Sequence, residues 1–387
     1  MSLELLLPRA GRRLERYAPR AEPPAWPKPQ GPIRSRVAYA AAHVVKDPLG
    51  PDSGPDAIDW EATVAYRRHL WSYGLGVADA MDTAQRGMGL DWEATKALVR
   101  EACAAARAAG GAIVCGANTD QGPEGALLSL DDIADLYLEQ VEHIEAAGGR
   151  VVVMCSRHLA KAAKGPEDYA YVYDRVLSRV KEPAIVHWLG EMFDPALTGY
   201  WGSRDVAAAM DACLEVLGRH AAKVEGIKLS LLDAGHEVAM RARLPAGVRM
   251  FTGDDFNYPE LILGDGAHHS DALLGIFDAI APAASAALQA LDAGDEARYR
   301  EVLEPTVALS RHVFQAPTYN YKTGVVFLAY LNGFQDHFRM VAGMESARSV
   351  THLAELFVLA DRAGVLLEPE LAVEHMRLVL RLAGVEA

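Results

Sequence analysis

The residue with the clearest potential for chemistry is Lys228, because it lies in a short apolar run, Val224 to Leu232, that is typical of a buried parallel strand. Lysine is among the residues least often buried, and desolvation favours its neutral amine. A neutral amine can attack a carbonyl carbon and form a Schiff base. We therefore treat Lys228 as a candidate nucleophile. The alternative is a lysine at a strand end whose stem packs while its ammonium group reaches water.

The elements that must position this lysine are predicted by short apolar runs that alternate with longer helical patterns, as in a parallel sheet. Eight such units fit an α/β fold of the (β/α)8 type, the TIM barrel, which usually needs about 250 residues. A doubly wound sheet competes with this fold, but no GxGxxG or GxxxxGK[ST] turn follows an early strand. The predicted strands cover 36–45, 74–81, 112–115, 151–154, 184–187, 226–229 and 248–252, with an eighth near 266–268.

Only helical patterns follow from about residue 282 onward, and they predict a C-terminal helical domain. The proline-rich first 35 residues predict an irregular arm that packs on the surface or on a neighbouring subunit. The expected organisation is an arm over 1–35, a TIM barrel over 36–282 and a helical domain over 283–387. The predicted helices of this last domain cover 284–291, 301–314, 325–334, 350–363 and 369–382.

Composition narrows the classes of partner. With 51% hydrophobic residues among 387, the chain can bury a large core, and its net charge of −14 offers no basic footprint for nucleic acid or a membrane surface. The four cysteines are scattered without a CxxC pair, and no segment resembles a signal peptide or a membrane span. We expect a cytoplasmic protein with reduced thiols that acts on a small molecule.

Polar residues gather where the predicted strands end, and catalytic groups of a TIM barrel come from those ends and the loops after them. We expect Lys228 and His187 to carry the chemistry. The remaining candidates are expected to bind substrate, and no metal site is expected among them. They are, in strand order, Asp82, Thr83, Ala84, Asn118, Arg157, His158, Asp254 and Asp255.

Four segments occur in an order and spacing that carry a family likeness over about residues 35 to 335: Ile113 to Thr119, Gly226-Ile227-Lys228, Thr252 to Asp255 with the turn Leu263 to Gly266, and Ala281-Pro282 with Ala293 to Asp295. Together they resemble the dihydrodipicolinate synthase and N-acetylneuraminate lyase superfamily of class I aldolases. This resemblance implies a lysine at strand six that forms an imine with a 2-oxo acid. It also implies a homodimer or homotetramer.

The turn that holds the substrate carboxylate in that superfamily differs in this chain. The superfamily has "GTTGE" after strand two, and Asp82 to Arg86 stands there instead, with Thr83 as the one matching threonine. Asp82 would repel a carboxylate unless Arg86 or backbone amides offset its charge, which argues against pyruvate itself as substrate.

The proton-relay tyrosine of the superfamily is replaced by His187 at the end of strand five. Histidine titrates near neutral pH and can relay protons, whereas a core histidine without a role is the alternative. Tyr200, in a long connection over 191–205 that predicts a lid, could also replace the tyrosine, unless its ring only packs the loop onto the barrel. We expect Lys322 to be a residue of the surface or rim.

These residues together predict a class I lyase or aldolase. It would capture a small oxo acid or sugar-like oxo compound as an imine on Lys228, without an organic cofactor, and then cleave or form a carbon–carbon bond or dehydrate the substrate. One alternative is a barrel that binds a metabolite without converting it. Another is a metal-dependent aldolase or isomerase, although HxH and HExxH spacings are missing. Its ligands would come from Asp82, His187, Asp254, Asp255, His268 and His269.

Overall fold

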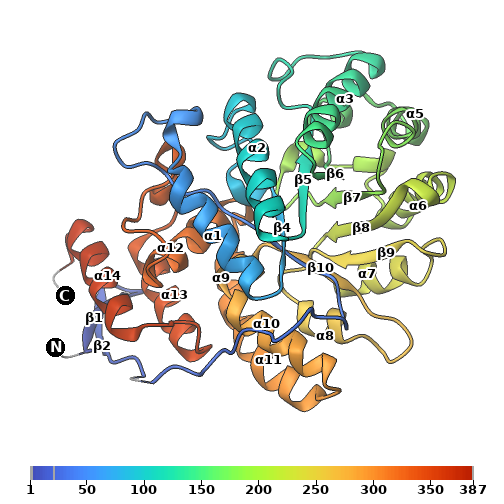
Figure 1. Cartoon of the computed structure of the whole chain (residues 1–387). Coiled ribbons are helices and arrows are strands. Elements are labelled where there is room, and N and C mark those ends of the chain that lie inside the picture. Colours follow the sequence, from blue (N-terminus) through green and yellow to red (C-terminus); the bar gives the residue numbers. More distant parts are fainter. Residues whose placement is uncertain (1–2, 21, 386–387) are drawn as a thin grey trace.

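The computed structural model describes residues 3–20 and 22–385, so residues 1, 2 and 21 of the predicted arm and 386 and 387 of the predicted helical domain lie outside the described residues. Eight parallel strands close into a barrel in the order β10-β3-β4-β5-β6-β7-β8-β9. The predicted TIM barrel is therefore confirmed (Figure 1). Its strands are β3 Ala38–Ala41, β4 Gly76–Asp79, β5 Ile113–Ala117, β6 Arg150–Val153, β7 Ala184–Leu189, β8 Val224–Ser230, β9 Arg249–Thr252 and β10 Asp271–Leu274.

The prediction of the eighth strand near 266–268 is wrong, because β10 begins at Asp271. Gly264 and Gly266 both have positive φ, at 81° and 87°, and the Asp265 amide donates to the His268 carbonyl at 3.0 Å. These residues form a turn that an extended strand cannot contain. His268 and His269 thus precede the strand and lie at the end of the barrel opposite the carboxyl ends of the strands.

Helices form the outer layer of the barrel, and most of them begin at side-chain caps. The carboxylates of Asp59, Asp91 and Asp205 each accept a backbone amide of the following first turn, and Ser129 forms the predicted capping box with Asp132. The outer helices are α1 Trp60–Ser72, α2 Trp92–Ala109, α3 Leu130–Ala146, α4 Arg157–Ala162, α5 Pro166–Leu177, α6 Val206–Arg219, α7 Ala234–Arg241, α8 Tyr258–Leu263 and α9 Ile276–Ala279.

The helices after residue 280 pack together beside the barrel, and each predicted helix of this region overlaps an observed one (Figure 1). α12 is buried along its whole length. Because its residues are almost all apolar, this helix belongs in the middle of the layer, between the barrel and the outer helices. The helices are α10 Ala281–Asp292, α11 Glu296–Val313, α12 Tyr321–Leu331, α13 Val350–Arg362 and α14 Pro369–Leu382. Short 3-10 helices are η1 Pro55–Ala57, η2 Asp82–Ala84, η3 Pro195–Leu197, η4 Tyr200–Gly202, η5 Ala221–Lys223, η6 Thr318–Asn320 and η7 Val341–Ala347.

The N-terminal segment is more regular than predicted. β1 Leu5–Arg9 and β2 Arg13–Tyr17 form an antiparallel hairpin that lies beside α13 and α14 (Figure 1). Leu5 and Leu7 are buried because alternate residues of a strand face the same side, here toward α13. The hydroxyl of Tyr17 donates to Asp361 of α13 at 2.5 Å. The expected irregular arm is therefore wrong over the hairpin.

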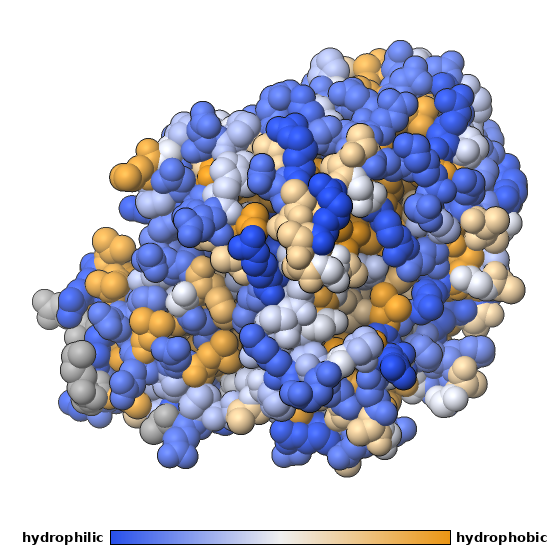
Figure 2. Space-filling model, in the orientation of Figure 1, coloured by the Kyte–Doolittle hydropathy of each residue, from blue (hydrophilic) through white to orange (hydrophobic). Residues whose placement is uncertain are grey.

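The surface shown in Figure 2 is mostly hydrophilic, with apolar side chains in small separate groups. Leu49 is 95% exposed and Leu382 is 84% exposed, but scattered apolar residues of this kind are normal on proteins. None of the helices in the described ranges has an apolar stretch of the length that a bilayer crossing requires.

Candidate active site

A cavity of about 790 Å³ opens at the carboxyl ends of β4 to β7, where TIM barrels carry their sites. The first turn of α12 closes one side of it, through Lys322. The wall is mixed, with five acidic and four basic side chains among apolar ones. The ionisable lining residues are Asp82, Arg86, Asp91, Asp120, Glu124, Arg157, His158, Lys161, His187, Asp194 and Lys322.

Lys228 points into the barrel. Side chains of a strand alternate, and its neighbours Ile227 and Leu229 belong to the core outside the barrel. The side chain is 5% exposed, so it is not on the outer wall. Gly253 on the next strand leaves room for it, because a Cβ there would come within 2.9 Å of the Lys228 Cε atom.

The amino group of Lys228 is not locked against another group. Within residues 3–20 and 22–385 it forms no hydrogen bond and no ion pair. Burial lowers the pKa of Lys228 below the usual value of lysine, and the carboxyl groups of Asp82 and Asp255 offset part of that shift. Lys228 lies beneath the residues that line the cavity, whereas its neighbours His187 and Asp82 do line it.

His187 lies directly beside Lys228, since the two residues are register partners on β7 and β8. Its Nε2 atom is 3.1 Å from the hydroxyl of Ser230, and its Nδ1 atom has no partner among the described residues. Burial, together with the charge of Lys228, lowers the pKa of His187 well below its usual value. The imidazole is therefore neutral at physiological pH, with one nitrogen available to a guest.

The turn after β4 brings a third group to this cluster. Asp82 Oδ2 accepts a hydrogen bond of 2.9 Å from the hydroxyl of Tyr321, which also lies 2.6 Å from the Thr83 hydroxyl. Burial alone would raise the pKa of Asp82, but the charges of Lys322 and Lys228 lower it below the usual value. Ala84 contributes only to the backbone of the turn, where its amide donates to the Met81 carbonyl.

Arg86, one of the groups that could offset the charge of Asp82, pairs with Asp120 instead. The guanidinium forms two hydrogen bonds with the carboxylate of Asp120, at 2.8 and 2.7 Å, and a third with the Gly116 carbonyl at 2.5 Å. These bonds hold it in the wall between the ends of β4 and β5. The offsetting charges come from two lysines instead.

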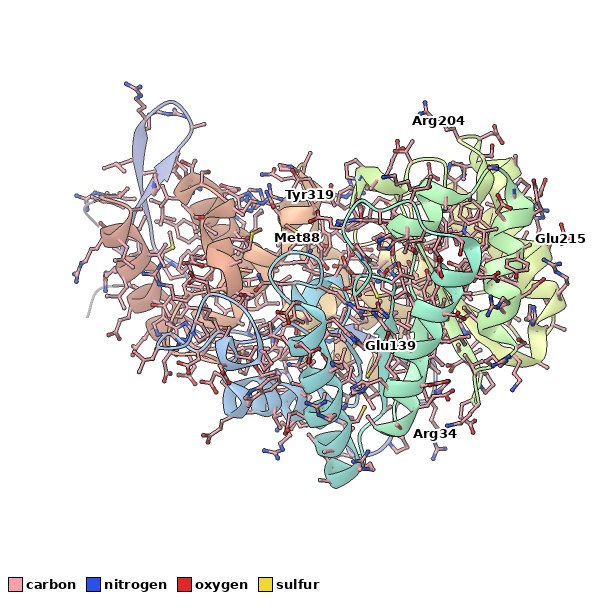
Figure 3. The ribbon with its side chains drawn as sticks, turned by 90° about the horizontal axis from the view of Figure 1, so that it is seen from above. Arg34, Met88, Glu139, Arg204, Glu215 and Tyr319 are labelled. Atoms are coloured by element: carbon pink, nitrogen blue, oxygen red, sulfur yellow. The ribbon has the colours of Figure 1, made fainter. Side chains whose placement is uncertain are left out.

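The expectation that Lys322 lies at the surface or rim is wrong. Its side chain is 3% exposed and lines the cavity near Asp82. Met88 and Tyr319 flank it, and they lie close together when the molecule is seen from above (Figure 3). Tyr321 and Lys322 are the site residues that the sequence analysis missed, because a tyrosine and a lysine at a helix start carry no signal of what the helix faces.

Asn118, Arg157 and His158 all line the cavity, as predicted for substrate-binding residues, but each already has protein partners. The His158 ring nitrogens contact the Thr119 hydroxyl and the Pro123 carbonyl, both at 3.0 Å. Arg157 donates to Asp194 at 2.6 Å. The Asn118 side chain donates to the Cys155 carbonyl at the end of β6 and accepts a hydrogen bond from the Thr119 amide. These three residues therefore form part of the cavity wall through contacts that are already made within the protein.

Asp254 and Asp255 follow β9 and do not line the cavity. Asp254 accepts the amides of Phe256 and Asn257 at 2.8 and 3.1 Å and so holds the turn before α8. Asp255 is 4% exposed and lies near Lys228. Burial raises the pKa of Asp255 to about 8, which keeps it protonated at neutral pH and able to donate a proton.

Tyr200 packs the long connection after β7 onto the barrel. Its hydroxyl accepts the Ser156 amide at 3.2 Å and lies 3.1 Å from the Tyr173 hydroxyl, and its ring contacts Tyr169 and Trp201. Tyr200 does not line the cavity. Phe193, from the same connection, does line it, so one part of this connection borders the site and the other part is packing.

No three His, Cys, Asp or Glu side chains in the described part of the chain are arranged to hold a metal ion. His268 and His269, two of the ligands considered for such a site, lie at the opposite end of the barrel from His187. The candidate metal ligands therefore lie at two different ends of the barrel and do not form one site.

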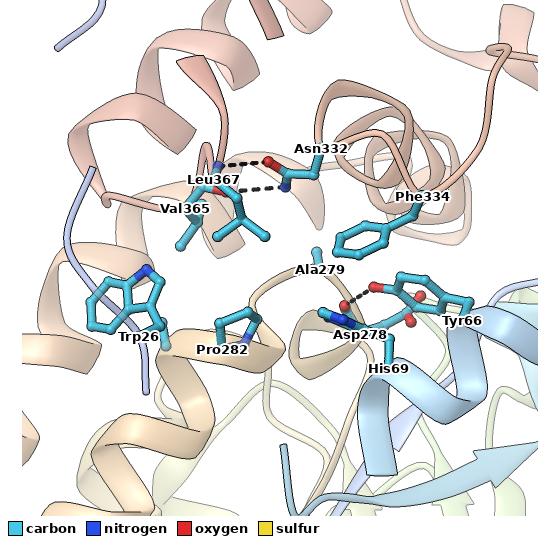
Figure 4. Close-up of a pocket in the computed structure, with 11 residues that line it drawn as sticks. Trp26, Tyr66, His69, Asp278, Ala279, Pro282, Asn332, Phe334, Val365 and Leu367 are labelled. Atoms are coloured by element: carbon cyan, nitrogen blue, oxygen red, sulfur yellow. Dashed lines mark hydrogen bonds between the residues drawn. The ribbon is translucent and has the colours of Figure 1, made fainter. Parts of the chain in front are cut away.

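A second cavity lies between α1, α9 and the C-terminal helices (Figure 4). Its volume is about 10 Å³, which is room for no more than one water molecule. Asn332 forms two hydrogen bonds with the backbone of Val365 and Leu367, whereas His69 Nε2 and Asp278 Oδ1 have no partner among the described residues. The cavity is therefore too small to hold a substrate.

Comparison with known proteins identifies a matching family and solved structures with a similar fold. The family described as "Protein of unknown function (DUF993)" matches residues 5–385. Among curated proteins, no sequence matches the chain. The fold is similar to that of dihydrodipicolinate synthase from Thermotoga maritima, with 15% identity, a TM-score of 0.64, and 85% of this chain and 99% of that chain covered.

Two further solved structures have the same fold. The 4-hydroxy-tetrahydrodipicolinate synthase from Methylacidiphilum fumariolicum SolV is 15% identical, with a TM-score of 0.63 over 88% of this chain and 99% of that chain. KD(P)GA from T. tenax is 17% identical, with a TM-score of 0.54 over 78% of this chain and 89% of that chain. The resemblance drawn from the sequence motifs is thus confirmed for the fold.

Proposed function

The chain belongs to the family described as "Protein of unknown function (DUF993)", and we propose that this member is a class I lyase or aldolase that forms an imine between Lys228 and a small oxo compound. The observation that carries the proposal is the buried, unpaired amine of Lys228 inside the barrel, beside an imidazole and a carboxylate. The similarity in fold to dihydrodipicolinate synthases supports it.

The first step uses the neutral amine. Burial lowers the pKa of Lys228, so more of the amine is unprotonated near neutral pH than for an exposed lysine. Its nitrogen adds to the carbonyl carbon and gives a carbinolamine. Loss of water then requires one proton on the leaving hydroxyl, and Asp255 holds a proton because its pKa is raised to about 8.

The second step uses the iminium as an electron sink. The bond between the α and β carbons breaks, and its electron pair forms the enamine, while the departing fragment loses a proton and becomes a carbonyl compound. His187 accepts that proton on Nδ1, which has no partner among the described residues. The ionised carboxylate of Asp82 stabilises the positive charge on the iminium. Protonation of the enamine and hydrolysis of the imine then release the second product and restore Lys228.

The substrate class follows from the size and polarity of the cavity. A volume of about 790 Å³ exceeds what a three-carbon acid fills, and its wall offers many hydrogen-bonding groups. We propose a hydroxylated oxo compound, and we keep the expectation that Asp82 disfavours a carboxylate directly beside the reacting carbonyl. The expected homodimer or homotetramer and the cytoplasmic location stay predictions.

The experiment that tests this proposal is reductive trapping. Sodium borohydride is added to the protein with a panel of 2-oxo acids, hydroxyketones and hydroxyaldehydes, and the adduct is located by peptide mass mapping. We expect a stable adduct on Lys228 with at least one compound and none in Lys228→Arg, which keeps the charge but has no nucleophilic amine. If compounds of the panel raise the Tm of the protein but leave no adduct, the result would favour a barrel that binds a metabolite without converting it.

A further inference from the structure

The side chain of Lys322 is a buried cation that the proposed reaction does not use. It is 3% exposed at the start of α12 and lines the cavity. Its ammonium group has three weak partners, the Met88 sulfur at 3.3 Å, the Tyr319 carbonyl at 3.4 Å and the ring of Tyr321, whose centroid is 5.0 Å away. Sulfur is a poor acceptor, and 3.4 Å is beyond the usual range for a nitrogen–oxygen hydrogen bond.

Lys46 shows how this fold treats a buried lysine that has only a structural role. Its side chain is 7% exposed, and its ammonium group donates to the carbonyls of Asp47, Gly50 and Pro51 at 2.9, 3.0 and 2.7 Å. The three donors of that ammonium group are all used. The ammonium group of Lys322 has no comparable set, although a buried charge is costly without strong partners.

The two arginines of the cavity wall are already paired, and the exposed Lys161 donates to the Gly125 carbonyl. Arg86 binds Asp120 and Arg157 binds Asp194, each at hydrogen-bonding distance. Lys322 forms no ion pair within the described ranges of the chain, even with Asp82, whose charge acts on it from a longer distance. A desolvated ammonium group that faces a cavity and has no bound carboxylate is suited to an anion from outside the protein.

We propose that Lys322 binds an anionic group of the substrate, a carboxylate or a phosphate, at a point away from the reacting carbonyl. This inference rests on the proposed imine at Lys228, which marks the position of the carbonyl carbon. The carboxylate of Asp82 lies near both amines, because its charge raises the pKa of each lysine and their charges lower its own pKa. An anion next to the carbonyl carbon would meet Asp82, and an anion further along the substrate would meet Lys322.

The substrate is then an oxo compound with one charged end. Its carbonyl carbon reaches Lys228 and His187, and its neutral middle passes Asp82 and the hydroxyl of Tyr321. The carboxylate of Asp82 can accept a hydrogen bond from a substrate hydroxyl, and the hydroxyl of Tyr321 can donate or accept one. Its anionic end lies against α12. The residue that selects for charge would therefore come from the C-terminal helices rather than from the barrel.

The test compares reductive trapping rates for compounds that differ in charge. The probes are neutral dihydroxyacetone, dihydroxyacetone phosphate with a remote phosphate, 4-oxopentanoate with a remote carboxylate, and pyruvate with an adjacent carboxylate. In the unmodified protein we expect a remote anion to raise the rate at low probe concentration by about 10- to 100-fold over the neutral compound. The phosphate and carboxylate probes show which of the two anions the site prefers.

The substitution Lys322→Met should abolish this preference, so that its anionic and neutral probes are trapped at rates within about threefold of one another. Lys322→Arg should keep part of the preference because it keeps the charge. If the methionine variant does not fold, the arginine variant provides the test of the preference instead. Lys181→Met is the matched control, because it removes one exposed positive charge at the other end of the barrel. An unchanged preference in Lys322→Met, or a preference for pyruvate over both remote anions, would refute the assignment.

A second measurement separates this inference from the imine itself. Inorganic phosphate and acetate cannot form an imine, so their effect on thermal unfolding reports anion binding alone. We expect one of them to raise the Tm of the unmodified protein and of Lys228→Arg, but not that of Lys322→Met. If neither ion raises the Tm of the unmodified protein, or if all variants respond equally, the anion site is wrong whether or not Lys228 is trapped.

Discussion

The two ends of the barrel differ in how completely their charged residues are paired. At the amino ends of the strands, Arg150 pairs with Glu225, and Arg249 pairs with Asp271 at 2.7 Å. At the carboxyl ends, Lys228 has no ion pair among the described residues although it is buried. The first end uses ion pairs to join strands of the barrel. The second also has ion pairs, such as Arg86 with Asp120, but it holds a buried amine that has no ion pair among the described residues.

This difference shows where the fold gives up stability. An unpaired amine in the barrel costs desolvation free energy that no partner returns, and such strain persists only where the rest of the structure holds it in place. The paired end needs no ligand to be complete. We propose that a carbonyl compound and an anion bind at the end that holds Lys228 and Lys322, which is why we assign function to that end.

The strongest test of the comparison replaces the unpaired amine itself. Lys228→Met should reduce turnover at least about 1,000-fold, because no other amine occupies its position. The same change should raise the free energy of unfolding by about 1 kcal/mol, since a methionine of similar length needs no hydrogen bonds in the barrel. Denaturant unfolding and a turnover assay check both parts, and a large loss of stability would show that the amine is structural.

Asp82→Asn should have the next largest effect, with turnover reduced about 100-fold because the iminium loses its counter-charge. The carboxylate of Asp82 raises the pKa of Lys228, so its removal lowers that pKa further. The amine then loses its proton at lower pH, and the rising limb of the trapping rate should shift toward acid. A pH profile that stays in place, measured with the same probe, would mean that Asp82 does not act on the amine.

Two buried carboxyl groups allow a sharper comparison. The pKa of Asp255 and that of Glu237 are both raised to about 8 by burial, but Glu237 is held by the hydroxyls of Thr252 and Ser270, away from the amine. A carboxyl group whose pKa is higher in the folded state stabilises the fold fully below its unfolded pKa, and this contribution is lost as pH rises through about 8.

The free energy of unfolding should therefore fall between about pH 4 and pH 8, by at most about 1.4 kcal/mol per pH unit for each group. Asp255→Asn and Glu237→Gln should each make this fall less steep. Only Asp255→Asn should also slow turnover, by about tenfold, because only that group donates a proton at the site. Chemical unfolding at several pH values and steady-state rates check the pair, and equal effects on turnover would remove Asp255 from the mechanism.

The smallest effect is expected at the paired end. Arg249→Met leaves the buried carboxylate of Asp271 without its ion pair and should lower the free energy of unfolding by about 1–3 kcal/mol. Turnover should not change, because this end of the barrel does not touch the cavity. Denaturant unfolding measures the first quantity, and a change in turnover beyond about twofold would contradict the separation of the two ends.

Much of the architecture could be predicted from periodicity. The apolar runs of β3 to β9 and the capping residues of the helices are local signals, so seven of the barrel strands were found. The eighth was misplaced because Gly264 to His268 contains polar turn residues next to the strand, and the N-terminal hairpin was missed because its Pro8 and charged residues hide the alternation of Leu5 and Leu7.

The candidate site was predicted in part. Lys228 and His187 were found because a polar residue in an apolar strand is visible in the sequence. Lys322 is predicted at the surface or rim, since α12 is apolar after its first turn and nothing in its sequence shows that this turn closes the barrel. Arg86 is one of the groups that could offset the charge of Asp82, but its pairing with Asp120 depends on a loop from another strand.

The sequence alone determined the strands and helices, their order, and the placement of a lysine and a histidine at neighbouring strand ends, because these features depend on local patterns of polarity and on the register of a closed barrel. Only the tertiary structure decided which charges are paired. Ion pairs join residues far apart in the chain, and the free energy of a buried charge depends on every group that packs around it. That is why Lys46, Lys228 and Lys322, all lysines and all buried, differ in what they can do.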